Sequence, residues 1–127
     1  MRLFPARAPR IATELGISIL LRNESSGEIV AEAVSGRLCN ISEDGACIEV
    51  VSPLASGYHL FYRTLNTETF SLVLTGDFAT EPVSSFAVAA SSVWMNVTEE
   101  EQEPGFRIGV RFRESQRWLF KYFKRKS

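Results

Sequence analysis

The strongest constraint on the fold is a strict alternation of apolar and polar residues near the end of the sequence. The alternating residues are Phe106, Arg107, Ile108, Gly109, Val110, Arg111, Phe112 and Arg113. A period of two places successive side chains on opposite faces of a β-strand. We therefore predict a strand whose apolar face lies in a core and whose arginine-bearing face meets water.

Other segments are also predicted to be strands of an antiparallel meander. They are residues 17–21, 46–50, 58–63 and 70–74, and the turn-like Asn66-Thr67-Glu68 joins the last two. Along residues 86–97 the apolar positions change from even to odd numbers, which predicts a β-bulge near Ser91 and Ser92. Polar loops are expected at residues 24–28 and 99–104.

After residue 113 the pattern becomes helical. Ser115 is a candidate N-cap, and basic residues near the C-terminal end suit the helix dipole. An apolar stripe recurs at helical spacing and comprises Trp118, Leu119, Tyr122 and Phe123. We expect this stripe to pack against the strands, and a surface for a partner is the alternative.

The order of these elements indicates the fold class. Several short strands, one terminal helix and no β-α-β alternation predict an all-β fold. We expect an antiparallel barrel of about six strands, or a strongly curled sheet, with a C-terminal α-helix. The expected single domain covers residues 1–127, with an N-terminal arm at 1–12, the barrel at 13–113 and the helix at 114–127.

Composition and charge narrow the function classes. Hydrophobic residues make up 45% and charged residues 23% of the chain, as in soluble globular proteins. A formal net charge of −1 lacks the broad positive field of a non-specific nucleic-acid binder, so no DNA or RNA partner is expected. Without an apolar leader or a long apolar stretch, we expect a cytoplasmic protein with no membrane insertion. Cys39 and Cys47 are then expected to be free thiols in a reducing compartment.

The sequence offers little for catalysis. His59 is the only histidine and falls inside a predicted strand, where a packing or surface role is expected. One histidine and two cysteines cannot by themselves close a structural zinc site, and there is no glycine-rich phosphate loop or nucleophile elbow. We therefore expect no enzyme, no catalytic residue, no bound metal and no cofactor.

The most informative segment is residues 40–45, Asn-Ile-Ser-Glu-Asp-Gly, between two predicted strands. Ordinary turn chemistry is one interpretation of it. The Asn40 and Ser42 side chains would bond to nearby backbone, and Gly45 would supply a positive φ. On that interpretation the segment connects two strands and has no further function.

The same segment resembles the Asp/Asn-x-Ser-x-x-Gly motif of the PilZ family, whose bacterial domains bind cyclic-di-GMP. Asn40, Ser42 and Gly45 occupy the fixed positions of that motif. Four more features fall where the family has them: Pro9-Arg10 before the first strand, Gly36 at the start of the run into the motif, residues 46–48 as the next strand, and residues 106–112 as the last strand before a helix. The resemblance extends from about Arg7 to the C-terminal helix, and it implies a PilZ-like split barrel.

The resemblance also implies a site for a ligand with two guanines and two phosphates, where the N-terminal arm meets the turn. Its candidate ligand-binding residues are Arg7, Arg10, Asn40, Ser42 and Gly45. An arginine can contact guanine O6 and N7 or a phosphate, and the Asn40 amide oxygen can accept from guanine N–H groups. Ser42 can bond a phosphate, a base or its own turn, and Gly45 allows backbone to approach the ligand closely.

The arginine motif departs from the family. In PilZ domains it is R-x-x-x-R, often ending Pro-Arg, and aligning its last arginine with Arg10 places Ala6 where the first arginine belongs. Arg7 lies one residue later. A bidentate arginine contact is worth about 1–3 kcal/mol, so its loss would weaken binding about tenfold to a hundredfold.

Two functions follow as hypotheses. The first is a cyclic-di-GMP effector whose arm becomes ordered on binding and changes the contacts made with an unidentified protein partner. The alternative is a degenerate PilZ-like module that binds a protein and no nucleotide, which Ala6 favours. A barrel that binds single-stranded nucleic acid would need aromatics on a basic face, whereas the aromatics here fall mostly in core phase. Analogy suggests second-messenger control of motility or biofilm, and it leaves a homodimer open.

Overall fold

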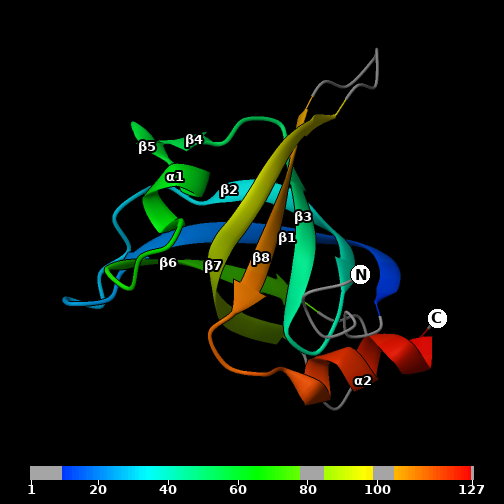
Figure 1. The fold of residues 1–127 in the computed structure, drawn as a ribbon. Helices are drawn as coiled ribbons and strands as arrows, with labels where there is room; N and C mark the ends of the chain where they lie inside the picture. The colour runs from blue at the N-terminus through cyan, green and yellow to red at the C-terminus, as the bar shows by residue number, and fades with distance from the viewer. Residues whose placement is uncertain (1–9, 78–84, 99–104, 127) are drawn as a thin grey trace, which may run out of the picture.

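The computed structural model describes residues 10–77, 85–98 and 105–126, so Arg7 and the loop expected at 99–104 lie outside the described residues. The elements are β1 (Ile11–Asn23), β2 (Val34–Ile41), β3 (Gly45–Val50), β4 (Leu54–Ala55), β5 (Tyr58–His59), α1 (Leu60–Thr64), β6 (Phe70–Asp77), β7 (Ser85–Thr98), β8 (Gly105–Phe112) and α2 (Arg117–Lys126). Figure 1 shows the strands wrapped around one core, with α2 and α1 towards opposite ends of the molecule.

Six of the strands form a closed barrel in the order β1-β2-β3-β8-β7-β6, and β6 pairs back onto β1. Every neighbouring pair is antiparallel. The prediction of a six-stranded antiparallel barrel followed by a helix is therefore confirmed. No described helix has both the length and the apolar character that crossing a bilayer requires.

The alternation in β8 sorts the side chains as predicted. Ile108, Val110 and Phe112 are buried, whereas Arg107 and Arg111 are exposed. Aliphatic side chains from the other strands complete this core, including fully buried isoleucines and leucines of β1, β3 and β6. The period of two thus correctly assigned one face of β8 to the core and the other to the outer surface of the barrel.

A bulge interrupts β7 next to the predicted position. The register of β7 on β8 shifts between Ser92 and Trp94, so Ser92 pairs with Val110 but Trp94 pairs with Gly109. One extra residue in a strand moves the following side chains to the other face. The bulge therefore keeps Met95 opposite Ile108 and turns Trp94 to the outer surface.

The prediction of a strand over residues 58–63 is wrong. Only the two residues of β5 are extended, and the chain then turns into the short helix α1. His59 is the N-cap of α1, because its side chain accepts a hydrogen bond from the Tyr62 N–H, so it does not lie mid-strand. Leu60 and Thr64 face the core one helical turn apart, and the Thr64 hydroxyl bonds to that of Ser92 at 2.7 Å. Burial of these side chains fixes the helix in place of the expected strand.

Helix α2 starts one residue later than a Ser115 cap requires. The Phe120 N–H donates to the Gln116 carbonyl at 3.0 Å, which makes Gln116 the residue that closes the first turn. Leu119, Phe120 and Phe123 are buried in the barrel core. Packing of the predicted apolar stripe is therefore confirmed for Leu119 and Phe123, whereas 46% of Trp118 is exposed.

Candidate ligand-binding site

The turn between β2 and β3 is organised around the buried side chain of Ser42. The Ser42 backbone N–H donates to the Gly45 carbonyl at 2.8 Å. The Ser42 hydroxyl oxygen accepts from the backbone N–H of Gly45 at 3.1 Å and from that of Asp44 at 3.3 Å. The hydroxyl thus satisfies backbone groups that a tight turn would otherwise leave without partners. Of the three roles predicted for Ser42, the structure shows bonding to its own turn.

Gly45 is required here for a reason that differs from the predicted one. Its φ is not positive, since the positive-φ glycines among the described residues are Gly27 and Gly57. A Cβ built on Gly45 would instead overlap the carbonyl oxygen of Val110 in β8. The glycine therefore allows β3 and β8 to approach closely where Gly45 pairs with Arg111.

Backbone bonds connect the turn to the end of β8 and to the start of α2. The Asp44 carbonyl accepts from the Phe112 N–H at 2.8 Å, and the Glu43 carbonyl accepts from the Gln116 N–H at 2.7 Å. The Glu43 carboxylate also lies 3.5 Å from the Arg117 guanidinium. A shift of this turn would therefore move the segment that positions α2.

Arg10 lies beside this turn although it is 30 residues from Asn40 in the sequence. Its Nη1 group donates to the Asn40 side-chain oxygen at 2.7 Å. The register of β1 on β2 explains the proximity, because Ala12 pairs with Asn40. The structure thus brings together the arginine and the asparagine that the sequence predicted to share a site.

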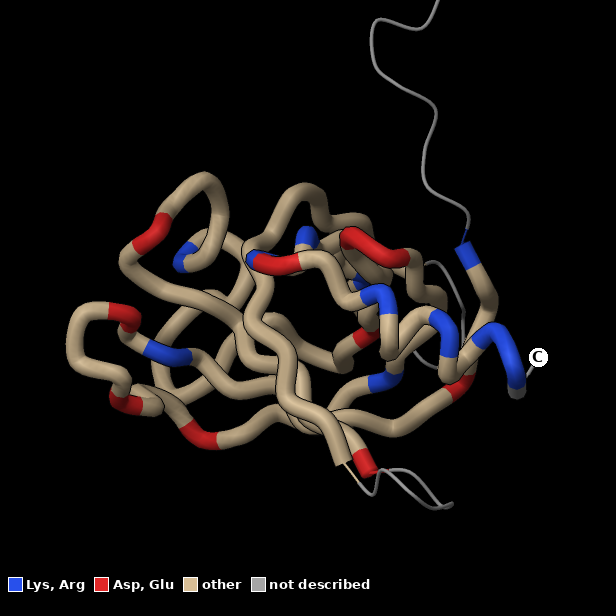
Figure 2. Tube along the Cα trace, turned by 90° about the horizontal axis from the view of Figure 1, so that it is seen from below, with Lys and Arg blue, Asp and Glu red and all other residues tan. Residues whose placement is uncertain are grey.

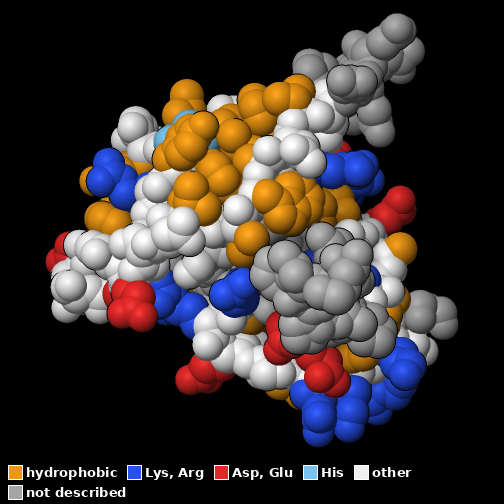
Figure 3. Space-filling view, in the orientation of Figure 1, with side chains coloured by type: hydrophobic (Ala, Val, Ile, Leu, Met, Phe, Trp, Pro, Cys, Tyr) orange, Lys and Arg blue, Asp and Glu red, His pale blue; other side chains and the backbone are white. Residues whose placement is uncertain are grey.

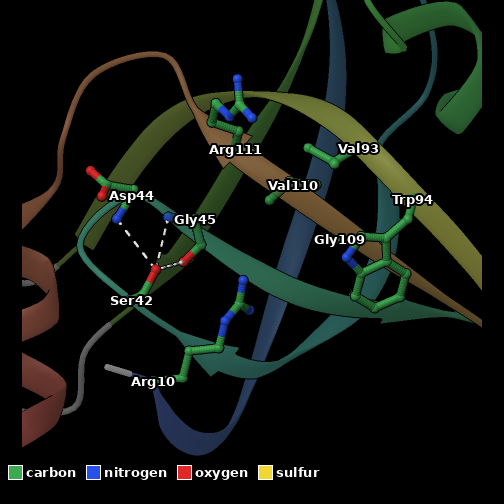
Figure 4. Close-up of a pocket in the computed structure, with 9 residues that line it drawn as sticks. All are labelled: Arg10, Ser42, Asp44, Gly45, Val93, Trp94, Gly109, Val110 and Arg111. Carbon is green, nitrogen blue, oxygen red and sulfur yellow. Dashed lines mark hydrogen bonds between the residues drawn. The ribbon is translucent and has the colours of Figure 1, made fainter. Parts of the chain in front are cut away.

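A pocket of about 210 Å³ lies on the outer surface of the barrel beside these groups. Its lining residues, drawn in Figure 4, are Arg10, Ser42, Asp44, Gly45, Val93, Trp94, Gly109, Val110 and Arg111. Three of the five predicted site residues line it, and a fourth, Asn40, is hydrogen-bonded to the lining residue Arg10. Arg7, the fifth, is outside the described residues.

Sequence reasoning missed six of the nine lining residues, and Trp94 is the only aromatic one among them. Its indole covers Gly109 on the neighbouring strand, where any Cβ would overlap the ring (Figure 4). The signals that could have revealed it were the bulge in β7 and a glycine at position 109, within the arginine-bearing face of β8. The indole and Arg111 give the pocket an apolar ring and a second cation.

A cluster of charged side chains lies across strands β2, β3 and β8. The Glu49 carboxylate accepts from Arg37 and from Arg107, each at 3.1 Å. Partial burial opposes ionisation of Glu49, but these two hydrogen bonds lower its pKa, so it stays charged. Arg37 also lies 3.9 Å from the Glu14 carboxylate, so two carboxylates balance the two arginines of this cluster.

The two cysteines lie on β2 and β3, and both are free thiols as predicted. Burial, the nearby Cys47 and the Glu49 carboxylate raise the pKa of Cys39 to about 11. Burial likewise raises the pKa of Cys47. Both thiols are therefore protonated at neutral pH and are poor nucleophiles.

Replacing Ser42 with alanine is expected to lower the free energy of unfolding by about 1–3 kcal/mol, because a buried N–H then loses its acceptor. Urea denaturation monitored by circular dichroism measures this loss. Ser35→Ala, at an exposed position on the preceding strand β2, is the matched control and should change stability by less than about 0.5 kcal/mol. Equal stabilities of the two variants would contradict a structural role for the Ser42 hydroxyl.

The pocket is lined by Arg10, Arg111 and the Trp94 indole, whereas the Asp44 carboxylate points away from that indole (Figure 4). Two arginines and an indole can bind a planar ring that carries hydrogen-bond acceptors and a phosphate. Within the described ranges, no three His, Cys, Asp or Glu side chains are grouped to hold a metal ion. Comparisons of the chain with models of known protein families, with curated proteins and with solved structures found no match.

Proposed function

We propose that this protein is a PilZ-like receptor that binds cyclic-di-GMP in the pocket beside residues 42–45. The observation that carries the proposal is the hydrogen bond from Arg10 to Asn40. It joins the two sequence motifs that the resemblance requires at one site, beside a pocket that Arg10 also lines. Neither motif alone would support the proposal, because each occurs by chance in unrelated sequences.

The chemistry of the lining supports guanine in particular. Arg10 and Arg111 can bond guanine O6 and N7 or a phosphate oxygen, and the face of Trp94 can stack on the base. Guanine O6 is an acceptor for such an arginine, whereas adenine carries an amino donor at that ring position. Asn40 would exchange its bond with Arg10 for bonds to the ligand.

The size of the pocket limits how much of the ligand it encloses. Its volume of about 210 Å³ is below the roughly 300–1,000 Å³ typical of pockets that enclose a drug-sized ligand. We therefore assign one base and its phosphate to the pocket, with the rest of the dinucleotide outside it. Arg7 stays a predicted contact for that outer part.

The contacts of the turn suggest how binding would reach a partner protein. Carbonyl groups of Glu43 and Asp44 bond to the start of α2 and to the end of β8. Ligand contacts at Asp44 would therefore bias the position of α2, which a partner could sense.

A protein-binding module without nucleotide is the second candidate. Ala6 favours it, and so does an apolar surface around His59 on β4, β5 and α1 (Figure 3). In this surface 58% of Leu54 and 65% of Tyr62 are exposed. Capture of a partner that is indifferent both to cyclic-di-GMP and to Asn40→Ala would support this candidate.

Calorimetric titration tests the receptor function. We expect saturable binding of cyclic-di-GMP and much weaker binding of cyclic-di-AMP, because adenine has an amino donor where guanine offers the O6 acceptor to an arginine. The bound nucleotide should also raise the melting temperature, since it binds only the folded state. No heat and no thermal shift at high micromolar cyclic-di-GMP would overturn the proposal.

A further inference from the structure

The exposed side of α2 carries a concentrated positive charge. Four described basic residues point away from the barrel: Arg117, Lys121, Lys124 and Arg125. With 3.6 residues per turn, these positions fall within an arc of about 100° around the helix axis. The helix contains no acidic residue. Figures 2 and 3 show these basic residues gathered at the end of the molecule that α2 forms.

The remaining side chains of α2 hold this basic face outward. Leu119, Phe120 and Phe123 are buried against the barrel, on the opposite side of the helix. Trp118 lies at the edge of the basic arc, 46% exposed, and its Nε1 group donates to the Gln116 side chain at 3.1 Å. The helix therefore presents basic side chains with a half-exposed aromatic ring beside them.

The ion pair described between this face and the barrel joins Arg117 to Glu43. Their closest atoms are 3.5 Å apart, and 70% of the Arg117 side chain is exposed. Such an exposed pair contributes little and is screened by salt. A chain whose formal net charge is −1 thus carries a locally cationic end.

We propose that the basic face of α2 binds reversibly to the surface of an anionic phospholipid bilayer. Each Lys or Arg near such a surface raises the partition coefficient about fivefold, so four of them give a preference of several hundredfold over a neutral bilayer. Trp118 belongs at the headgroup level, where tryptophan is enriched. An exposed cationic helix face with this ring suits a flat anionic surface. A bound peptide would instead need a groove in the protein.

Sedimentation with lipid vesicles tests the proposal on the full-length protein without nucleotide. Vesicles of equal parts phosphatidylglycerol and phosphatidylcholine should bind the protein, and vesicles of phosphatidylcholine alone should not. The double variant Lys121→Gln and Lys124→Gln should lose about 25-fold in partition coefficient, at about fivefold for each lysine. Lys121→Arg with Lys124→Arg keeps the charge and should bind like the wild type.

A matched control removes the same charge from the other end of the molecule. Arg22→Gln with Arg63→Gln also takes away two positive charges, but from the end of β1 and from α1. This variant should keep the wild-type affinity for anionic vesicles. Trp118→Phe should abolish the shift of tryptophan fluorescence on binding while Trp94 still reports the fold.

Three results would overturn the proposal. They are equal binding to both kinds of vesicle, unchanged binding of the lysine-to-glutamine variant, or an equal loss in the Arg22 and Arg63 control. Tighter binding to a DNA duplex than to anionic vesicles would also overturn it, and would assign the basic face to nucleic acid. Because every arm omits cyclic-di-GMP, the outcome is independent of the receptor function.

Discussion

Replacing Arg10 with alanine is expected to weaken cyclic-di-GMP binding about tenfold to a hundredfold and to leave folding stability almost unchanged. A bidentate arginine contact with guanine contributes about 1–3 kcal/mol, and the substitution removes it. The Arg10 side chain is exposed and bonds to Asn40 at the surface, so its loss should cost the fold less than about 0.5 kcal/mol. Calorimetry gives the affinity, and urea denaturation gives the stability.

Two companion variants separate the possible causes of a loss. Arg10→Lys keeps the charge but not the planar fork, so it should recover only the part of the affinity that comes from general attraction. Arg22→Ala removes an arginine that pairs with Glu24 at the far end of β1, and it should bind like the wild type. An Arg10→Ala protein with unchanged affinity would show that the nucleotide does not use this pocket.

The barrel was predictable because the patterns that indicate its strands lie between neighbouring residues of the sequence. Alternation in β8 and the change of phase in β7 are properties of neighbouring residues, and each follows from the period of a strand. Helix α1 was not predictable in this way. Its aromatic and aliphatic residues are equally typical of a strand. Burial of Leu60 and Thr64 against other strands is what favours the helix.

The site was predictable in its residues but not in its geometry. The sequence gives the order of Arg10 and Asn40, whereas their contact depends on the register of β1 on β2, which only the folded barrel defines. Trp94 was missed for the same kind of reason. Its position over Gly109 follows from a bulge whose residue has to be known to within one position.

Gly45→Ala is expected to lower the free energy of unfolding by about 2–3 kcal/mol, a large part of the roughly 5–15 kcal/mol of a typical domain. The added Cβ would overlap the Val110 carbonyl oxygen, which belongs to backbone and cannot rotate away as a side chain could. Relief requires β3 and β8 to separate at Gly45, where the turn from Ser42 ends and β3 begins. Urea denaturation of the variant measures the loss.

Gly16→Ala is the matched control, because Gly16 is an exposed strand glycine whose added Cβ would meet no atom within 4 Å. It should leave stability equal to the wild type or slightly higher. Gly109→Ala should fall between the two, since its obstacle is the Trp94 side chain. Equal stability of the Gly45 and Gly16 variants would contradict the close approach of β3 and β8.

The Gly45 result also determines how binding data on this motif are interpreted. If Gly45→Ala shifts the strands, its loss of cyclic-di-GMP binding would report a change in the barrel, as the loss in Ser42→Ala would report a change in the turn. Arg10→Ala keeps both features, because its side chain lies outside the barrel wall. A loss of affinity at unchanged stability in that variant is therefore the result that assigns the nucleotide to this pocket.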